Sequence, residues 1–402
     1  MCRCFKKKRK VWCVNMLNAK IIGVGAAGNK AAIHLIEKGL FNRESVLLLN
    51  STLRDVPEQY KDNAIEFGTV RGCGKERDTA KQMIMQSLHD KEVDLDTFIQ
   101  PSDQLVVIVT SVEGGTGCGA SSVLAQYIDQ VLGKNVHMFA LCGFEEDVRG
   151  LKNTVEWFND LSEKYVVEAI SNKKFLGPDK NRAKAEEAAN EEFANRIGIL
   201  IGSEITPSSS NMDDRDLFKV ATTPGFMTIE TCHLGKLKDQ EQFNALLQTM
   251  IDDSKSLETE QSAKRFGIVI NTSDKALAAI DESFDVLIKS YGRPFELFKH
   301  YQNVHDDDYI NIIISGMKIP VDTIKGVYNK FKEQFDQVDK SKDNFFNRRD
   351  FNTDEGDIFN TSVGSTSADE IKRRSASFFK GFDSPKPVES NSSFKNTNIN
   401  EL

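Results

Sequence analysis

The residues best suited to chemistry run from Gly114 to Ala120 and read Gly-Gly-Thr-Gly-Cys-Gly-Ala. They follow the apolar run Leu105 to Val109 and precede a helix-like stretch, Ser121 to Leu132. Glycine has no Cβ, so the backbone N–H groups of such a loop can crowd around one anion. The positive end of the following helix dipole adds to this attraction. We predict a phosphate-binding loop that is not an ordinary P-loop, because the Gly-Lys-Ser/Thr ending is missing.

A second glycine loop lies near the N-terminus, where Gly23, Gly25 and Gly28 form G-x-G-x-x-G after an apolar run. This motif occurs in dinucleotide-binding folds. A nicotinamide cofactor would need an acidic side chain near the end of the second strand, where this chain has Asn50. Two such loops suit one ligand with several phosphates. An NAD-dependent oxidoreductase stays as an alternative, and tight strand–helix packing would also explain Gly25 and Gly28.

Composition narrows the class of protein. The 402 residues are enough for roughly two to three domains. The content is 39% hydrophobic and 28% charged, as in a soluble globular protein, and no apolar stretch approaches the ~20 residues of a bilayer span. A net charge of −8 argues against a dedicated nucleic-acid binder. The seven cysteines show no disulfide or metal-ligand spacing, which indicates a reducing cytoplasm and no metal site built by the chain itself.

The first residues are basic and lack the apolar segment of a secretory signal. We treat residues 1–18 as a basic N-terminal extension. Our preferred interpretation is that translation starts at Met16, which an intact-mass measurement showing Met1 would contradict. An arm that touches a membrane or nucleic acid is the alternative.

The first half alternates apolar runs with helical patterns, which predicts a mostly parallel sheet covered on both faces. We expect strands at Lys20 to Val24, Val46 to Leu49, Leu105 to Val109 and Val136 to Leu141, and helices at Asn29 to Lys38 and Asp78 to His89. Apolar residues at spacings of three and four predict a further helix from about Gly150 to Ser171. A longer helix, Arg182 to Glu204, would span more than ~30 Å and act as a spine between two domains.

The second half predicts a smaller α/β domain with a mixed sheet. We expect a short helix near Asp214 to Ala221, strands at 226–229, 266–270 and 309–314, and helices at 240–250, 273–291 and 321–335. From Asp339 the composition shifts to Ser, Asn, Asp and Lys, which predicts a disordered tail. Its spaced phenylalanines are either docking points for an adaptor protein or incidental.

Taken together, these motifs resemble the tubulin/FtsZ superfamily over about residues 19–317. The loop after Glu113 resembles the family's signature loop, and Ile21 to Asn29 resembles the N-terminal phosphate loop of FtsZ. Glu145 and Arg149 sit as in the Phe-Glu-Gly-x-x-Arg segment, which meets the ribose and the nucleotide. Further matching segments are Asn50-Ser51-Thr52, Ile170 to Leu176, and Ala188-Ala189-Asn190, where the family reads guanine.

The resemblance implies a GTPase that binds GTP or GDP, with Mg²⁺ sharing the phosphate charge because no P-loop lysine is present. The implied nucleotide-binding residues are Gly25, Ala26, Ala27, Gly28, Asn29, Gly114, Gly115, Thr116, Gly117, Cys118, Gly119, Glu145, Arg149, Asn172 and Asn190. The implied domains are 19–181 for GTP binding, 182–222 for the central helix and catalytic loop, 223–338 for a C-terminal activation domain, and 339–402 for the tail.

The implied catalytic residues are Asn211, Asp213 and Asp216, which fit the family's Asn-x-Asp-x-x-Asp loop. In the family this loop faces the nucleotide of the next subunit, so the active site is completed in a head-to-tail homopolymer. The two aspartates would polarise a water for attack on the γ-phosphate while Asn211 places it. Helix capping is the alternative role for these aspartates.

Several residues depart from the family pattern. Glu113 replaces the first glycine of a triple, so the loop bends differently or binds with altered affinity. Glu186 stands where FtsZ commonly has an aromatic, and Gly72-Cys73-Gly74 is a shortened loop. The chain ends without the docking peptide of division proteins. We therefore expect a cytoplasmic filament that positions plasmid, phage or other DNA. A cell-division ring and a non-hydrolysing, nucleotide-dependent scaffold remain alternatives.

Overall fold

A computed structural model describes residues 15–68, 72–161, 164–206, 212–235, 237, 239–273, 280, 284–304 and 307–341. Asn211, the basic segment before residue 15 and the predicted tail from residue 342 on lie outside these ranges. No helix in the described ranges is both long and apolar enough to cross a membrane.

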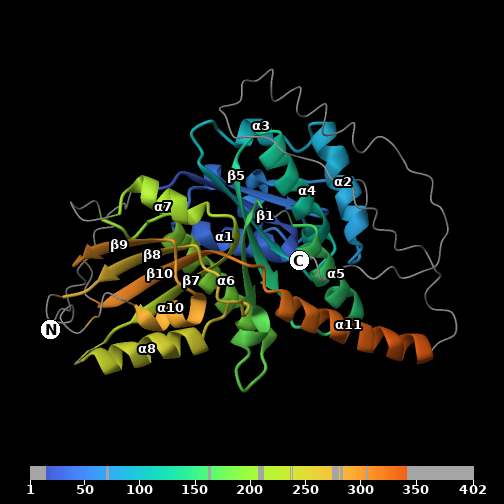
Figure 1. Cartoon of the computed structure of the whole chain (residues 1–402). Coiled ribbons are helices and arrows are strands. Elements are labelled where there is room, and N and C mark those ends of the chain that lie inside the picture. The colour runs from blue at the N-terminus through green and yellow to red at the C-terminus, as the bar shows by residue number, and fades with distance from the viewer. Residues whose placement is uncertain are drawn as a thin grey trace, which may run out of the picture.

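One sheet of ten described strands forms the centre of the molecule, in the order β3-β2-β1-β4-β5-β6-β7-β10-β8-β9 (Figure 1). The strands are β1 Ala19–Val24, β2 Val46–Asn50, β3 Ala64–Glu66, β4 Leu105–Ser111, β5 Asn135–Cys142, β6 Val166–Ser171, β7 Gly225–His233, β8 Arg265–Asn271, β9 Glu296–Gln302 and β10 Tyr309–Met317. Every pair from β3 to β7 is parallel, β10 is antiparallel to both neighbours, and β9 is parallel to β8. This agrees with the predicted parallel sheet followed by a mixed one.

Helices cover both faces of the sheet. The α-helices are α1 Gly25–Glu37, α2 Arg77–His89, α3 Leu95–Phe98, α4 Thr116–Gln130, α5 Val148–Asn159, α6 Arg182–Leu200, α7 Asp214–Ala221, α8 Gln240–Asp252, α10 Asp285–Tyr291 and α11 Val321–Ser341, and the 3₁₀ turns are η1 Arg43–Ser45, η2 Glu58–Asn63 and η3 Asn172–Phe175. Apolar residues of α2, α4, α5, α8, α10 and α11 form one buried cluster, and those of α1, α6 and α7 form the other. Successive residues of β1, such as Ile21 and Ile22, belong to opposite clusters, because neighbouring side chains of a strand point to opposite faces of the sheet.

The carboxyl ends of the parallel strands meet at one edge of the sheet. Val24 at the end of β1 pairs with Thr110 of β4 on one side and with Leu49 of β2 on the other. The loops that follow β1, β2 and β4 are therefore neighbours. This register places the two glycine loops side by side, as expected for strands of a doubly covered parallel sheet.

The central helix α6 runs across the sheet from that edge to the opposite one. Its amino end packs against η3, which directly follows β6. Beyond its carboxyl end, the carbonyl of Ile201 accepts the N–H groups of Met16 (3.0 Å) and Leu17 (3.2 Å), which lie just before β1. The predicted long central helix is confirmed, although it ends at Leu200 and four turn residues follow it.

The structure contradicts the predicted helix from 150 to 171. The helix α5 ends at Asn159, and Val166–Ser171 is the buried strand β6, paired with β5 and β7. The apolar residues of 166–171 happen to continue the spacing of the helix before them. Parallel pairing with β5 and β7 makes this segment a strand. The edge strand β9 was not predicted. The proposed domain boundary near residue 223 falls between β6 and β7, which pair within the same continuous sheet.

Candidate nucleotide-binding site

The amino ends of α1 and α4 meet at the glycine loops. Helix α4 starts at Thr116, earlier than predicted, so the second half of the signature loop is its first turn. A Cβ built on Gly25 would lie 3.0 Å from the backbone nitrogen of Gly117. Neither helix has a side-chain cap or an acidic residue in its first turn. Two positive helix ends with backbone donors thus converge on one place, which is an arrangement for binding phosphate.

Most glycines of the two loops are required by packing. A Cβ on Gly28 would lie 2.2 Å from the carbonyl oxygen of Val109, and one on Gly119 would lie 2.0 Å from that of Arg77. At Gly117 the clash would be with Thr110 Oγ1, at 2.2 Å. These three positions therefore need glycine whether or not a ligand binds. A Cβ on Gly114 would meet no atom within 4 Å, so that position faces open space.

Asn29 supplies a polar group that lacks a partner within the chain. It lies in α1 and is 2% exposed, yet neither its amide oxygen nor its amide nitrogen forms a hydrogen bond in the described structure. An unpaired buried amide is costly. At the same edge of the sheet, Ser51 Oγ and Thr116 Oγ1 lie 2.9 Å apart and link the end of β2 to α4. These residues fit a ligand with phosphate and hydroxyl groups, as predicted for a nucleotide.

The remaining signature-loop residues play structural roles. The Cys118 thiol donates to the carbonyl of Asn153 at 3.2 Å, and burial raises its pKa to about 12. Cys118 therefore stays protonated and unreactive near neutral pH. In the other glycine loop, Ala26 is exposed and Ala27 is half-buried at the start of α1. Gly115 packs against the backbone of Lys75, 2.7 Å from its built Cβ.

Glu145 and Arg149 follow β5, the strand beside β4. Glu145 adopts a left-handed conformation with φ of 59°, which is uncommon for a residue with a side chain. Its carboxylate pairs with Lys173 at 3.4 Å and with Lys330 of α11. Burial raises the pKa of Glu145, but the bonds from Lys330 and Lys173 outweigh it and lower the pKa overall. The guanidinium of Arg149 pairs with Glu76.

Asn172 and Asn190 lie further along the same side. Asn172 opens η3 after β6, and its buried Oδ1 accepts no hydrogen bond. Asn190 is half-buried on α6, and Glu186, one turn earlier, is exposed. The predicted binding residues thus follow the carboxyl ends of the neighbouring strands β1, β4, β5 and β6, or lie on the helix that starts near there.

The predicted catalytic aspartates lie elsewhere, at the start of α7. Asp213 Oδ1 accepts the N–H groups of Arg215 (2.9 Å) and Asp216 (3.0 Å), and Asp216 Oδ2 accepts the N–H of Asp213 (3.3 Å). This reciprocal pattern is a capping box. The capping role is therefore present. It uses one oxygen of each carboxylate, so both retain acceptor capacity.

Sequence reasoning missed the residues that fix the signature loop from outside. The side chain of Asn153, 2% exposed on α5, donates to the carbonyls of Lys75 (3.1 Å), Glu113 (3.3 Å) and Gly114 (3.1 Å). No sequence signal marked Asn153, because on the predicted helix it lies away from the apolar face that Leu151 and Val155 share. Among the described residues, no group of three or more His, Cys, Asp or Glu side chains could hold a metal ion.

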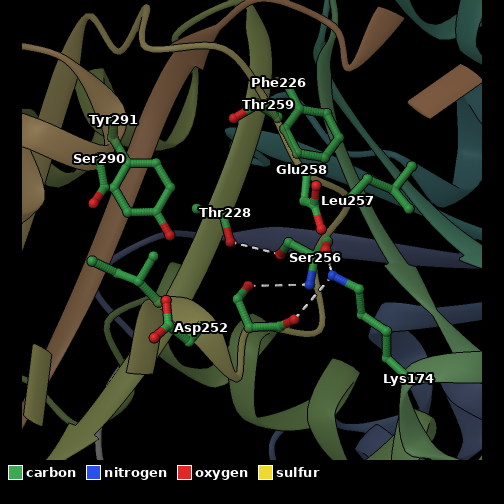
Figure 2. A pocket seen from close by; sticks show the side chains of 12 residues that line it. Lys174, Phe226, Thr228, Asp252, Ser256, Leu257, Glu258, Thr259, Ser290 and Tyr291 are labelled. Carbon is green, nitrogen blue, oxygen red and sulfur yellow. Dashed lines mark hydrogen bonds between the residues drawn. The ribbon is translucent and has the colours of Figure 1, made fainter. Parts of the chain in front are cut away.

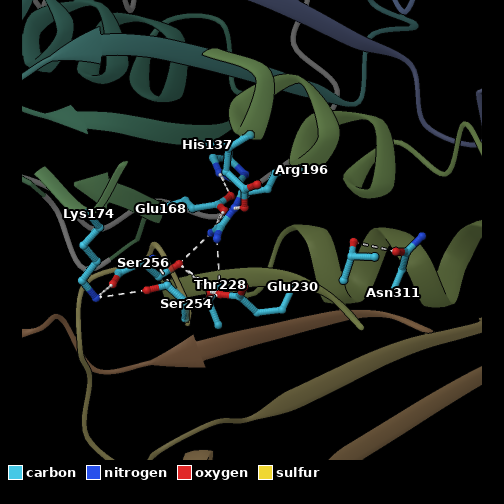
Figure 3. A network of polar contacts seen from close by, with 11 residues as sticks. His137, Glu168, Lys174, Arg196, Thr228, Glu230, Ser254, Ser256 and Asn311 are labelled. Carbon is cyan, nitrogen blue, oxygen red and sulfur yellow. Dashed lines mark hydrogen bonds and ion pairs between the residues drawn. The ribbon is translucent and has the colours of Figure 1, made fainter. Parts of the chain in front are cut away.

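A second polar region lies between β6, β7, α6 and the segment after α8. Arg196 of α6, whose side chain is 2% exposed, binds Glu168 (2.8 Å), Ser256 (2.6 Å) and Glu230 (3.3 Å) in Figure 3. Burial lowers the pKa of Arg196, but these carboxylates outweigh it and raise the pKa overall. A cavity of about 370 Å³ adjoins this network, with Lys174 and Tyr291 on opposite walls (Figure 2). None of the predicted nucleotide-binding residues lines it.

Comparisons with known proteins agree with this architecture. No protein-family model matches the chain. The cell division protein FtsZ of Mycoplasmopsis pulmonis is 26% identical over 166 residues, a match that spans only 40% of this chain and 40% of that protein. FtsZ of Aquifex aeolicus is 23% identical over 319 residues, which cover 76% of this chain and 84% of that protein.

Solved structures match over a longer stretch. The GTPγS-form protofilament of TubZ from Bacillus thuringiensis serovar israelensis has a TM-score of 0.68 at 16% identity, covering 81% of this chain and 95% of that one. At this identity the likeness concerns the fold. The resemblance that the sequence motifs indicated is therefore confirmed: the chain has the fold of the tubulin/FtsZ superfamily.

Proposed function

We propose that this protein binds and hydrolyses GTP and assembles head to tail into filaments. The nucleotide phosphates are held by the loops Gly25 to Asn29 and Gly114 to Gly119. Glu145, Arg149, Asn172 and Asn190 contact the nucleoside. Mg²⁺ bound together with the nucleotide would neutralise part of the phosphate charge. The TubZ protofilament with GTPγS supports both the ligand and the assembly.

The observation that carries this proposal is the separation of the two halves of the site. The glycine loops lie at the carboxyl ends of β1 and β4. Helix α6 instead ends beside Met16 and Leu17, which precede the amino end of β1. The six residues of β1 span about 20 Å, and the 19 residues of α6 span about 28 Å. Asp213 and Asp216 follow α6, so they lie toward the opposite edge of the sheet. They could meet a bound nucleotide only in the next copy of the chain.

The proposed chemistry is positioning and charge stabilisation. With one oxygen each left by the capping box, Asp213 and Asp216 orient a water toward the γ-phosphate of the neighbouring subunit's GTP. Asn211, outside the described residues, is proposed to help place this water. A repeated head-to-tail contact of this kind does not close on itself and yields an open filament.

Replacing Asp213 by asparagine tests the proposed role. Asparagine caps helices as well as aspartate does, so Asp213→Asn should keep α7 intact and remove only the carboxylate. We expect GTP binding and assembly to persist while phosphate release falls by at least ~100-fold. Asp214→Asn is the matched control, because Asp214 is exposed in the same turn and outside the motif. Phosphate release at the wild-type rate by Asp213→Asn would contradict the proposed role.

The capping box favours a second candidate, the non-hydrolysing scaffold, because it gives both aspartates a purely structural use. Phosphate release measured against protein concentration separates the two. A steep rise indicates sites formed between subunits, and no release at any concentration indicates the scaffold. We further propose that the filament positions plasmid or phage DNA. Imaging of a tagged protein distinguishes this use from a mid-cell division ring.

A further inference from the structure

Glu113, the residue that departs from the family's glycine triple, turns away from the phosphate-binding loop. Its carboxylate Oε1 accepts the backbone N–H of Glu145 at 2.9 Å, across 32 positions of sequence. Burial raises the pKa of Glu113, while the amides of Glu145 and Phe144 act in the opposite direction. A carboxylate bonded to a backbone N–H in a buried place makes one of the stronger protein hydrogen bonds. This bond joins the signature loop to the segment after β5.

The surroundings are shaped to accept this side chain. A Cβ built on Gly143 would lie 2.1 Å from Glu113 Oε2, and one on Gly150 would lie 3.3 Å from Glu113 Cβ. Any larger residue at position 143 would therefore push the carboxylate out. Asn153 holds the backbone carbonyl of Glu113 at 3.3 Å. The Glu113 side chain therefore packs between Gly143 and Gly150, and hydrogen bonds hold both its carboxylate and its backbone carbonyl.

The partner of Glu113 is a residue under backbone strain. Glu145 has φ of 59°, a region in which a residue with a Cβ persists only when its surroundings hold it there. The Glu113 carboxylate holds its N–H, and Lys173 and Lys330 hold its carboxylate. The conformation of Glu145 is therefore set by contacts from three separate elements.

We propose that Glu113 is a positioning residue that fixes Glu145 against the ribose of the bound nucleotide. The inference rests on the proposed function, in which Glu145 meets the ribose. The hydrogen bond from the Glu145 N–H to Glu113 would then hold the signature loop and the segment after β5 together as one rigid unit. The same bond explains how Glu113 is tolerated beside a phosphate site, because the negative charge of Glu113 is directed at the Glu145 amide and away from the open face of the loop.

The test compares GTP with 2′,3′-dideoxy-GTP, which lacks the ribose hydroxyls, by equilibrium binding to the full chain. We expect Glu113→Ala to weaken GTP binding by roughly 10-fold, as loss of a charge-assisted hydrogen bond implies, with little change for dideoxy-GTP. Glu113→Gln keeps an acceptor oxygen and should retain most of the preference for GTP. In a Glu145→Ala background, Glu113→Ala should have no further effect.

Gly143→Ala provides a second route if Glu113→Ala does not fold, because it displaces the carboxylate without removing it. It should reduce the preference for GTP in the same way. A preference unchanged in folded Glu113→Ala, or an equal loss for both nucleotides, would overturn the positioning role alone. If the wild-type chain binds neither nucleotide, the proposed function fails and this inference with it.

Discussion

Two buried asparagines near the glycine loops differ in whether their side-chain amides form hydrogen bonds within the chain. Asn153 donates to three backbone carbonyls of the loops it holds, whereas the amide of Asn29 has no partner in the described structure. Both are 2% exposed. An unsatisfied amide is retained at a cost that a ligand would offset. We infer that Asn153 serves the fold and Asn29 serves the ligand.

Alanine substitutions should separate these two roles. Asn153→Ala is expected to lower the free energy of unfolding by about 1–3 kcal/mol, because three carbonyls lose their donor. Asn29→Ala should leave the nucleotide-free protein within about 1 kcal/mol of wild type, because no bond is lost, while GTP affinity falls by at least ~10-fold. Chemical denaturation and calorimetric titration give the two quantities. Normal GTP affinity in Asn29→Ala would refute its assignment to the ligand.

At the level of elements, Arg196 joins the two halves of the sheet to the central helix. Its partners come from β6, β7 and the segment after α8, as Figure 3 shows. Glu168 is fully buried and Glu230 is 7% exposed. Without the guanidinium, two buried carboxylates would lose their positive partner. The network therefore fixes where α6 sits between the glycine loops and the start of α7.

Removing the positive charge of Arg196 should destabilise the folded protein strongly. We expect Arg196→Met to lower the free energy of unfolding by about 3–5 kcal/mol, the usual effect of leaving a buried charge unpaired. Lys184→Met is the matched control on the same helix, since its pair with Asp179 is exposed and should contribute at most ~1 kcal/mol. Thermal and denaturant unfolding measure both variants. Similar stability of the two would show that the network is not structural.

Local signals predicted the elements whose limits are set locally. The capping aspartates placed α7 at Asp214 to Ala221, and glycine loops placed the starts of α1 and α4 to within a few residues. The strand β6 was missed because its apolar residues continue the spacing of α5, and pairing with distant strands decides its state. The edge strand β9, polar and partly exposed, carries little strand pattern.

The same division holds at the site. Residues within one motif, such as Gly25 to Asn29, could be recognised because their spacing is itself the signal. The bond between Glu113 and the Glu145 amide, and the contacts of Asn153 and Lys330, join elements far apart in sequence. No local pattern specifies such contacts. The sequence could therefore suggest candidate binding residues, but it could not show which contacts hold them in place.

At the scale of the whole molecule, the two halves of the proposed active site lie toward opposite edges of one sheet. The central helix α6 connects them rigidly through its packing and through Arg196. A single chain could then bind GTP and yet lack the acids to hydrolyse it. Activity would belong to the contact between two copies, so it should depend on assembly and can be divided between two different variants.

Complementation between two inactive variants tests this claim most directly. Asp213→Asn keeps the nucleotide site but lacks the acid. Gly114→Asp keeps the acid, and its side chain fits the open space of the loop while its charge repels phosphate. Each alone should release almost no phosphate from GTP. Mixed in equal amounts, they should recover up to about a quarter of the wild-type rate, since random head-to-tail order pairs intact halves at that frequency. A mixture no more active than its separate components, although the Asp213→Asn chain binds GTP and both chains co-assemble, would contradict an active site shared between subunits.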